Sequence, residues 1–284
     1  MSPQFSIIIP VFNKQTVVRD TLQSVLNQSF PDYEVIAVND GSTDSSLSVL
    51  NEIRDKRLRI FSIHNSGPSG ARNYGIGQAA GEWIVVLDAD DILLPNALDV
   101  FNRVIEKWQG ADMIVSNFYD VNPEERRLHF PNTAERRIAN PYKAWFFRQI
   151  MPGAGAFACK KSLLDTIPYN EELRRSEDVE LLFRLFSTVK MISTPLPTME
   201  YRHQFSTESR KYPPIETEFK GHLSFDRDKS FWEKICLYEC YIEAKNTYPE
   251  DTERLYSFLR RRYKLILSYH LAFWYRALIR TLLH

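Results

Sequence analysis

Two aspartates separated by one residue, Asp88 and Asp90, follow directly after the apolar run at residues 83–87, and Asp91 comes next. Two carboxylates in this spacing at the end of a strand can project in the same direction. Carboxylate oxygens are ligands that Mg²⁺ and Mn²⁺ prefer, and a site with two of them leaves positions open for phosphate oxygens. The alternative is a solvated acidic turn that caps the helix beginning near Pro95. The position directly after a buried run favours the metal site.

Polar residues also follow the three apolar runs upstream of this cluster. Asn13 follows the run at residues 5–11, an Asp-Gly-Ser-Thr-Asp segment at 40–44 follows the run at 33–39, and a glycine-rich segment at 64–73 follows the run at 58–64. In an open α/β sheet, ligands bind at the carboxyl ends of the strands. Four successive runs therefore deliver Asp, Asn, Arg and Gly to one edge, which indicates a ligand site.

Two of these residues allow more than one interpretation. Asp40 can belong to a simple turn and helix cap, or it can accept a hydrogen bond from the imide N–H of a uracil base. Arg72 is expected in the first turn of a helix over residues 70–79, where a cation opposes the helix dipole. This unfavourable placement suggests that Arg72 serves an anion such as a diphosphate. The surrounding glycines permit close approach of the backbone, but they form neither a Walker motif nor a G-x-G-x-x-G motif.

The elements that must position these residues alternate along the first 120 residues. Strands are expected at 5–11, 33–39, 58–64, 83–87 and 113–119, with helices at 16–27, 47–53, 70–79 and 96–108. This alternation predicts a parallel sheet covered on both faces, in a doubly wound α/β fold. Beyond about residue 122 the expected elements are shorter: an apolar run at 155–159, a helix near 179–189 and a strand near 199–201. From about residue 229 only helical spacing is present, with an interruption at Pro249.

Four ordered segments together resemble the family-2 glycosyltransferases. They are Ser6-Ile-Ile-Ile-Pro-Val-Phe-Asn13, Val38-Asn-Asp-Gly-Ser-Thr-Asp44, Gly70-Ala-Arg-Asn-Tyr-Gly75 and Gly81-Glu-Trp-Ile-Val-Val-Leu-Asp-Ala-Asp-Asp91. The resemblance covers roughly residues 5–205. It implies a GT-A fold, which is Rossmann-like with a mostly parallel sheet. It also implies a UDP-sugar or similar nucleotide-diphosphate-sugar donor, Mn²⁺ or Mg²⁺ as cofactor, and inversion at the anomeric carbon. Membership would be of the bacterial polysaccharide type, acting in capsule or lipopolysaccharide synthesis.

The resemblance also implies roles for individual residues of this chain. Pro10 and Asp40 would border the uracil, Arg72 would lie near the ribose and diphosphate, and Asp88 would reach the ribose or a metal-bound water. Asp90, the last residue of the DXD motif, would bind the metal. The residues expected to complete or support the donor site are Val11, Asn13, Gly70 and Asp91.

An acidic pair downstream supplies the expected catalytic base. Glu177 and Asp178 precede a helical pattern, and by themselves they could simply cap that helix. The family's base usually lies in such a Glu-Asp pair, so the resemblance makes Asp178 the candidate that takes the proton from the acceptor hydroxyl. Glu177 is expected to support it.

The segment Tyr201-Arg-His203 departs from the family pattern, which is Tyr-Arg-x-His with a serine beyond. His203 comes one residue early in this chain. It is a candidate ligand of the metal or the diphosphate; the alternative is a structural hydrogen-bond donor.

Composition excludes some classes of protein. The 284 residues contain 36 Lys and Arg against 36 Asp and Glu, so the formal charge is zero and a nucleic-acid partner is not expected. Three cysteines cannot pair completely, which indicates a reducing compartment. The first residues carry no pattern of a targeting segment. We therefore expect a cytoplasmic protein, at the inner face of the cell membrane if it binds lipid.

The end of the sequence differs in charge from the rest. Residues 251–284 contain seven basic and two acidic residues, which gives +5 and leaves −5 for residues 1–250. A basic cluster at 260–264 precedes an apolar, aromatic run at 265–275. This composition suits a helix at an anionic membrane surface, or one that packs on its own domain or on a partner subunit of a homo-oligomer. The expected division is a catalytic domain at 1–225, with a donor half at 1–120 and an acceptor half at 121–225, and a helical extension at 226–284.

The favoured activity is sugar transfer to a glycan or lipid-linked acceptor, and two other functions remain open. A nucleotidyltransferase acting on a sugar phosphate would need a glycine-rich, basic loop after the first strand, and residues 10–14 do not supply one. The other alternative is a non-catalytic nucleotide-binding subunit of a glycan-assembly complex. The presence of both Asp90 and Asp178 argues against it.

Overall fold

The computed structural model describes residues 2–130, 134–205 and 213–282, with the side chains of 260 and 279–282 excepted. The cations Arg260 and Arg280 and the end of the Gln204–Ser209 segment, which take part in the sequence predictions, lie outside the described side chains or residues.

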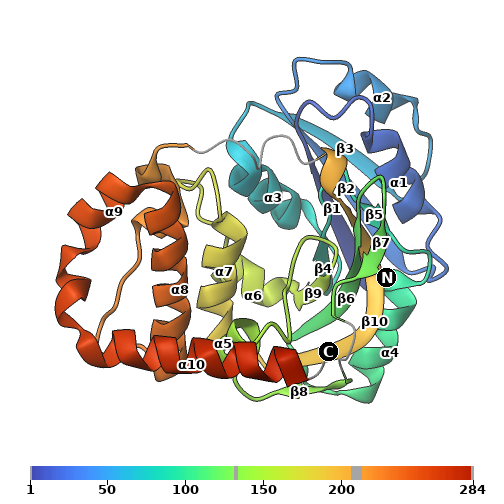
Figure 1. Ribbon diagram of the computed structural model, residues 1–284. Helices are drawn as coiled ribbons and strands as arrows, with labels where there is room; N and C mark the ends of the chain where they lie inside the picture. The colour runs from blue at the N-terminus through green and yellow to red at the C-terminus, as the bar shows by residue number, and fades with distance from the viewer. Residues whose placement is uncertain (1, 131–133, 206–212, 283–284) are drawn as a thin grey trace.

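A central sheet organises the chain (Figure 1). Within the described residues it has ten strands: β1 (Phe5–Val11), β2 (Tyr33–Asp40), β3 (Leu58–Ile63), β4 (Trp83–Val86), β5 (Ile92–Leu93), β6 (Met113–Val121), β7 (Arg126–Leu128), β8 (Arg136–Ile138), β9 (Phe157–Lys160) and β10 (Met191–Arg202). The main order is β3-β2-β1-β4-β9-β6-β10-β5, with β7 on β6 and β8 on β10. Neighbours β1–β2, β2–β3, β1–β4 and β6–β10 are parallel. The prediction of a mostly parallel α/β sheet is confirmed, and β9 enters it antiparallel to both β4 and β6.

Both faces of the sheet are covered. The helices of the main body are α1 (Val18–Leu26), α2 (Ser46–Glu52), α3 (Gly67–Gln78), α4 (Ala97–Lys107), α5 (Pro141–Phe146), α6 (Lys161–Thr166) and α7 (Glu177–Phe186). Successive side chains of a strand face opposite sides. In β1, Phe5, Ile7 and Ile9 accordingly pack in a core with α1 and α4, while Ile8 packs in a second core with α3 and α7. Burial on both faces requires the nearly continuous apolar run of this strand.

One helix boundary corrects a sequence argument. Helix α3 begins at Gly67, three residues before the predicted start, because Gly67 adopts φ +80° and Pro68 suits the first turn of a helix. Arg72 therefore lies in the second turn, and the argument from an unfavourable first-turn dipole is wrong. The strand predicted near 199–201 is the end of the longer β10.

Three helices end the described chain: α8 (Phe231–Thr247), α9 (Pro249–Tyr256) and α10 (Tyr263–Leu282), with the predicted break at Pro249. Short 3₁₀ turns precede or join them, η1 (His203–Phe205), η3 (Ile215–Thr217), η4 (Phe219–Gly221) and η5 (Ser257–Arg261). Helix α8 buries Ile235, Cys236 and Cys240 in the same core as α3 and α7, and the Cys236 thiol donates to the carbonyl of Tyr142 at 3.2 Å. The extension thus packs on the main body, while its division from it at residue 225 stays a prediction. None of the helices in the described part of the chain combines the length and apolar character that crossing a bilayer requires.

Candidate functional site

The turns that follow β1 and β2 are hydrogen-bonded to each other. Asn13 adopts φ +51°, a left-handed conformation that asparagine tolerates better than most residues. Its backbone N–H donates to Ser42 Oγ at 3.1 Å, and its side-chain oxygen accepts from the Thr43 N–H at 2.8 Å. Pro10 and Val11 end β1 directly before this contact. The first two predicted donor segments therefore lie side by side.

Asp40 connects the end of β2 to the start of α3. The side chain is buried, and its Oδ1 accepts from the Ser66 N–H at 2.7 Å and from Ser66 Oγ at 3.1 Å. The backbone here is too close for larger residues: a Cβ on Gly41 would lie 2.8 Å from the Asn65 nitrogen, and one on Gly70 would lie 2.5 Å from Ser66 Oγ. Both glycines are needed for this close approach.

Arg72 joins three separate elements. Its Nη1 lies 2.6 Å from Glu177 Oε1 at the start of α7, and its Nη2 lies 3.0 Å from Asp88 Oδ1 after β4. The guanidinium also lies over the Tyr169 ring, 5.2 Å from its centroid. Arg72 and Glu177 are 7% and 8% exposed, and the pKa of Arg72 is well above its usual value despite desolvation, because both carboxylates favour the charged form. Glu177 is 105 residues from Arg72 in sequence. The acidic cluster and the Glu-Asp pair thus meet at one buried cation.

Asp178, beside this cluster, has a different environment from Glu177. The residue remains accessible to solvent, and its Oδ1 accepts from the Val179 N–H at 2.8 Å. Desolvation by the protein around it and the Glu177 charge raise the pKa of Asp178 to about 6, although Arg72 acts in the opposite direction. An accessible carboxylate with a pKa near neutrality is suited to accept a proton.

The remaining aspartates of the acidic cluster are held by Lys14 and Arg202. Lys14 Nζ lies 2.6 Å from Asp90 Oδ2, and Arg202 donates through Nε to the Asp90 carbonyl at 2.5 Å. The Arg202 backbone N–H donates to Asp91 Oδ1 at 2.9 Å. Desolvation and Asp88 raise the pKa of Asp90, and Lys14 opposes this. Asp91 is 1% exposed, and burial raises its pKa as well. Its hydrogen bond with Arg202 anchors the turn to β10.

The acidic cluster fits a divalent metal only in part. Among the described residues, no group of three His, Cys, Asp or Glu side chains could hold a metal ion. Asp88 and Asp90 are nevertheless the oxygen ligands that Mg²⁺ takes when it is bound by one or two carboxylates together with substrate phosphates. The two aspartates therefore suit a metal that arrives with a diphosphate.

His203 forms its described polar contact elsewhere. Its Nε2 lies 3.1 Å from Asp120 Oδ1, and its ring packs edge-on to Tyr201 with a centroid distance of 4.5 Å. These contacts agree with the structural alternative, and binding of a metal by His203 stays a prediction.

Three further residues at the site escaped sequence reasoning: Lys14, Tyr169 and Arg202. The position of Lys14 just past the first strand was a usable signal, since a cation there lies at the edge where ligands bind. Arg202 belongs to the Tyr201-Arg-His203 segment, where a role was predicted only for His203. Tyr169 is buried under Arg72 and has no motif around it.

The loop that leads into α7 is held by a segment far downstream. The Arg174 N–H donates to the Thr217 carbonyl at 2.7 Å, and Ser176 Oγ donates to Glu218 Oε1 at 3.3 Å. Ser176 adopts φ +55°, an uncommon conformation for serine. Glu218 is fully buried and also lies 3.4 Å from Lys220 Nζ. The residue directly before the Glu-Asp pair is therefore fixed by a buried carboxylate.

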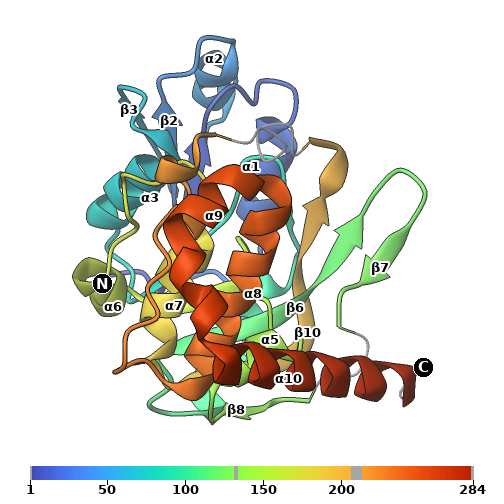
Figure 2. The same ribbon diagram turned by 60° about the vertical axis from the view of Figure 1, so that its left-hand side comes forward.

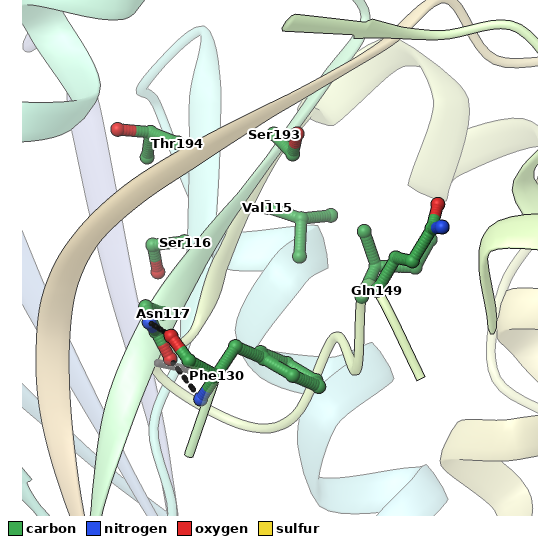
Figure 3. A pocket seen from close by; sticks show the side chains of 8 residues that line it. Val115, Ser116, Asn117, Phe130, Gln149, Ser193 and Thr194 are labelled. Atoms are coloured by element: carbon green, nitrogen blue, oxygen red, sulfur yellow. Dashed lines mark hydrogen bonds between the residues drawn. The ribbon is translucent and has the colours of Figure 1, made fainter. Parts of the chain in front are cut away.

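A small cavity lies apart from these residues (Figure 3). Its volume is about 10 Å³, room for about one water molecule, and its lining includes Val115, Phe130 and Thr194. Asn117 closes one side, where it donates to the Phe130 carbonyl at 2.7 Å and accepts from the Phe130 N–H at 3.1 Å. None of its lining residues belongs to the predicted site, and we interpret it as a packing void.

The chain is similar in sequence to known proteins. The family described as Glycosyl transferase family 2 matches residues 6–167. The chain is 31% identical over 179 residues to the GalNAc(5)-diNAcBac-PP-undecaprenol beta-1,3-glucosyltransferase of Campylobacter jejuni, covering 62% of this chain and 57% of that protein. It is 26% identical over 262 residues to the chondroitin synthase of Pasteurella multocida, covering 90% of this chain and 26% of the relative. The chain thus spans less than two thirds of either protein.

The fold resembles a solved structure over most of its length. Residues 1–349 of Staphylococcus aureus TarS, crystallised in complex with UDP-GlcNAc, superpose with a TM-score of 0.71 at 20% identity. The match covers 87% of this chain and 73% of that chain. The likeness in fold therefore reaches beyond residues 6–167, which match the family, and covers most of the chain.

Proposed function

Because the chain belongs to family 2 of the glycosyltransferases, we propose that it transfers a sugar from a UDP-sugar to a hydroxyl of a glycan or lipid-linked acceptor in bacterial surface polysaccharide synthesis. The observation that carries the proposal is the buried Arg72, which joins Asp88 to Glu177 beside the accessible Asp178. This contact supports a site to which both the predicted donor half and the expected base belong. The names of the relatives, a glucosyltransferase and a polysaccharide synthase, support the same class of reaction.

The donor would bind at the ends of β1 and β2. Both hydrogen bonds that the described residues make to Asp40 use Oδ1, which leaves Oδ2 to accept from a uracil imide N–H. Pro10, Val11 and Asn13 would border the base, and Gly70 would let the backbone approach the nucleotide. Asp88 would reach the ribose. The complex of TarS with UDP-GlcNAc supports a UDP-sugar as donor.

Asp90 would bind the divalent cation, Mn²⁺ or Mg²⁺, and Asp88 would reach the ribose or a water bound to that metal. When bound, the ion neutralises negative charge that develops on the departing diphosphate. Arg72 would add to the positive field near the diphosphate while it keeps Asp88 and Glu177 in place.

Asp178 would act as the base. Its carboxylate takes the proton of the acceptor hydroxyl as that oxygen forms a bond to the anomeric carbon, and the bond from this carbon to the diphosphate oxygen breaks on the opposite side. The diphosphate leaves with the bonding electrons, and attack from the opposite side inverts the configuration. Glu177 supports the base by fixing the start of α7 on Arg72.

We also propose where the enzyme is located and what its C-terminal helices contact. We expect the enzyme in the cytoplasm, with the acceptor half at about residues 121–225 and the helices after 226 meeting a membrane surface or a second copy. The nucleotidyltransferase alternative is weakened by Lys14, which contacts Asp90 and belongs to no glycine-rich loop. A non-catalytic subunit would not need an accessible carboxylate at Asp178 beside the Arg72–Glu177 pair.

The test is a panel of nucleotide sugars with and without Mn²⁺, scored by calorimetric binding and by nucleotide release. One donor should bind selectively and release nucleotide when an acceptor is added. Asp90→Asn should abolish the metal dependence of donor binding, whereas Asp99→Asn, at an exposed aspartate of α4, should not. If no nucleotide sugar binds in preference to the others, the transferase proposal is wrong.

A further inference from the structure

Helix α10 packs on the molecule along one side only. Tyr269 is buried against α5 and α8, and Arg276 Nη1 donates to the Phe146 carbonyl at 2.7 Å and to Glu239 Oε1 at 2.9 Å. Arg148 reaches the same glutamate at 3.2 Å. These contacts fix the rotation of α10 about its axis, and with it the direction of the opposite side.

The opposite side of α10 is apolar and exposed. Its large residues are spaced three or four apart and therefore form one face, as adjacent turns of a helix do. They are Tyr263 (77% exposed), Leu267 (61%), Leu271 (62%), Trp274 (72%) and Leu278 (56%), with Tyr275 (57%) at its margin. We call these six residues the outer face of α10. A contiguous apolar surface of this kind marks an interaction site.

The charge around the outer face selects its partner. Residues 257–284 contain six Lys and Arg and no Asp or Glu. Arg261, Arg262 and Lys264 are exposed at the start of the helix. Two copies joined through this face would bring like charges together, whereas an anionic surface would be attracted by them.

We propose that the outer face of α10 docks on an anionic lipid bilayer. An interfacial helix combines an apolar face with nearby cations, and tryptophan and tyrosine favour the level of the lipid headgroups. Each Lys or Arg near such a surface adds attraction that salt weakens. The helix would lie in the plane of the membrane, with Tyr269 and Arg276 holding it to the protein.

The position of α10 in the fold sets the orientation of the enzyme on the membrane. Helix α10 lies beside α5, which follows β8, and β8 pairs with Met191–Ser193 at the beginning of β10. The predicted site residues follow the carboxyl ends of β1, β2 and β4, the other ends of the strands. Figure 1 shows α10 along the lower edge of the molecule, whereas β1, β2 and β3 lie toward its upper part. In Figure 2, α10 runs along that edge past α8 and α5. The active-site edge would face away from the lipid.

This orientation restricts which acceptors can reach the active site, and this step rests on the proposed function. A hydroxyl directly beside the lipid would remain at the wrong edge of the molecule. The geometry therefore fits a lipid-linked chain in which several sugars separate the lipid from the reacting hydroxyl.

Vesicle sedimentation tests the docking. The full chain is mixed with vesicles of phosphatidylcholine alone or with phosphatidylglycerol added, at low and high salt. We expect at least tenfold stronger binding to the anionic vesicles, weakened by salt. Leu267→Glu with Leu271→Glu should abolish binding, and Arg261→Gln with Lys264→Gln should weaken it several-fold. Arg54→Gln with Lys56→Gln removes two exposed cations from the connection between α2 and β3, and should bind like the unchanged chain.

Each outcome bears on the proposal. Absence of vesicle binding, or full binding by the Leu267 and Leu271 variant, overturns it. A leucine variant that turns a dimer into a monomer, measured by light scattering without any lipid binding by the unchanged chain, assigns the face to a second copy and also overturns it. Donor binding measured on the same samples separates the two proposals: a chain that binds UDP-sugar but no vesicle refutes only the docking, and the converse refutes only the transferase.

Discussion

Glu177 and Asp178 are neighbours in sequence, and they have different surroundings in the structure. Glu177 is buried on Arg72, while Asp178 is accessible and lies within the field of Glu177. Desolvation by the surrounding protein and the Glu177 charge raise the pKa of Asp178, and this shift works against folding. Its folded pKa of about 6 lies above the ordinary 3.8, so the native state binds the proton more tightly than the unfolded chain. The contribution of Asp178 to stability therefore falls as the pH rises from about 4 through 6.

Replacing Asp178 by Asn should separate activity from stability. We expect turnover to fall by about 10²–10⁴-fold, the range of a lost general base, with donor binding unchanged. The midpoint of thermal unfolding at pH 8 should rise, because the substitution removes a carboxylate that is costly to ionise there. Calorimetry at pH 4 is the control, since Asp178 is then protonated in the folded state and the two midpoints should lie closer together. Unchanged turnover would mean that another group takes the proton.

The pH dependence of turnover should report the same carboxylate. Because the base must be ionised, kcat/KM, which reports the free enzyme, should rise about tenfold per pH unit below about 6 and level off above it. The measurement is nucleotide release at limiting donor between pH 5 and 8, with donor binding followed over the same range. A flat profile below pH 6 would contradict the assignment of Asp178.

Arg72 should be the residue of the site on which stability depends most. Arg72→Met leaves Glu177 buried without its cation, and breaking a buried pair in this way costs about 3–5 kcal/mol. Urea unfolding measures this loss. Adding Glu177→Gln should return part of it, because the uncompensated charge is then gone. A double variant that is no more stable than Arg72→Met would show that the pair is not coupled.

At the scale of elements, sequence patterns predicted the half of the fold that is locally encoded. The strands β1 to β4 and helices α1 and α4 follow from apolar periodicity, and the candidate site residues Asp40 and Asp88 were chosen from their position at strand ends. Long-range contacts were not predictable in this way. The antiparallel insertion of β9 between β4 and β6, and the contact of Arg72 with Glu177, depend on how distant segments meet. Prolines at 195 and 197 also obscured the pattern of β10, which starts at Met191.

The segment around Glu218 is the clearest element that patterns missed, and it should position the base. Glu218→Ala removes the acceptor of Ser176 Oγ and should lower kcat about tenfold or more while the donor dissociation constant stays unchanged. Glu218→Gln keeps an oxygen acceptor and should restore much of the rate, which a purely charge-based role would not allow. Equal losses in both variants would show that the charge facing Lys220 matters instead.

At the scale of the whole molecule, the zero formal charge conceals two unlike parts. Residues 1–250 carry −5 and residues 251–284 carry +5, the first holding the carboxylates of the site and the second the outer face of α10. These parts are mechanically joined, because α8 lies between α10 and the core that contains α3 and α7. Attachment to a surface through α10 would thus hold the sheet in a defined orientation.

Because α8 packs both on α10 and on the core that contains α3 and α7, we predict a single unfolding transition. Ile235 of α8 is fully buried in the core shared with α3 and α7, so Ile235→Ala should lower the free energy of unfolding of the whole chain by about 2–5 kcal/mol. Urea unfolding followed by circular dichroism and by loss of donor binding should give coincident curves, shifted together by the substitution. Leu255→Ala, at a partly exposed leucine of α9, is the control and should shift both curves little. If helicity is lost in a separate step that leaves donor binding intact, residues 226–284 fold as an independent unit, and the rigid orientation of the active site relative to α10 no longer follows.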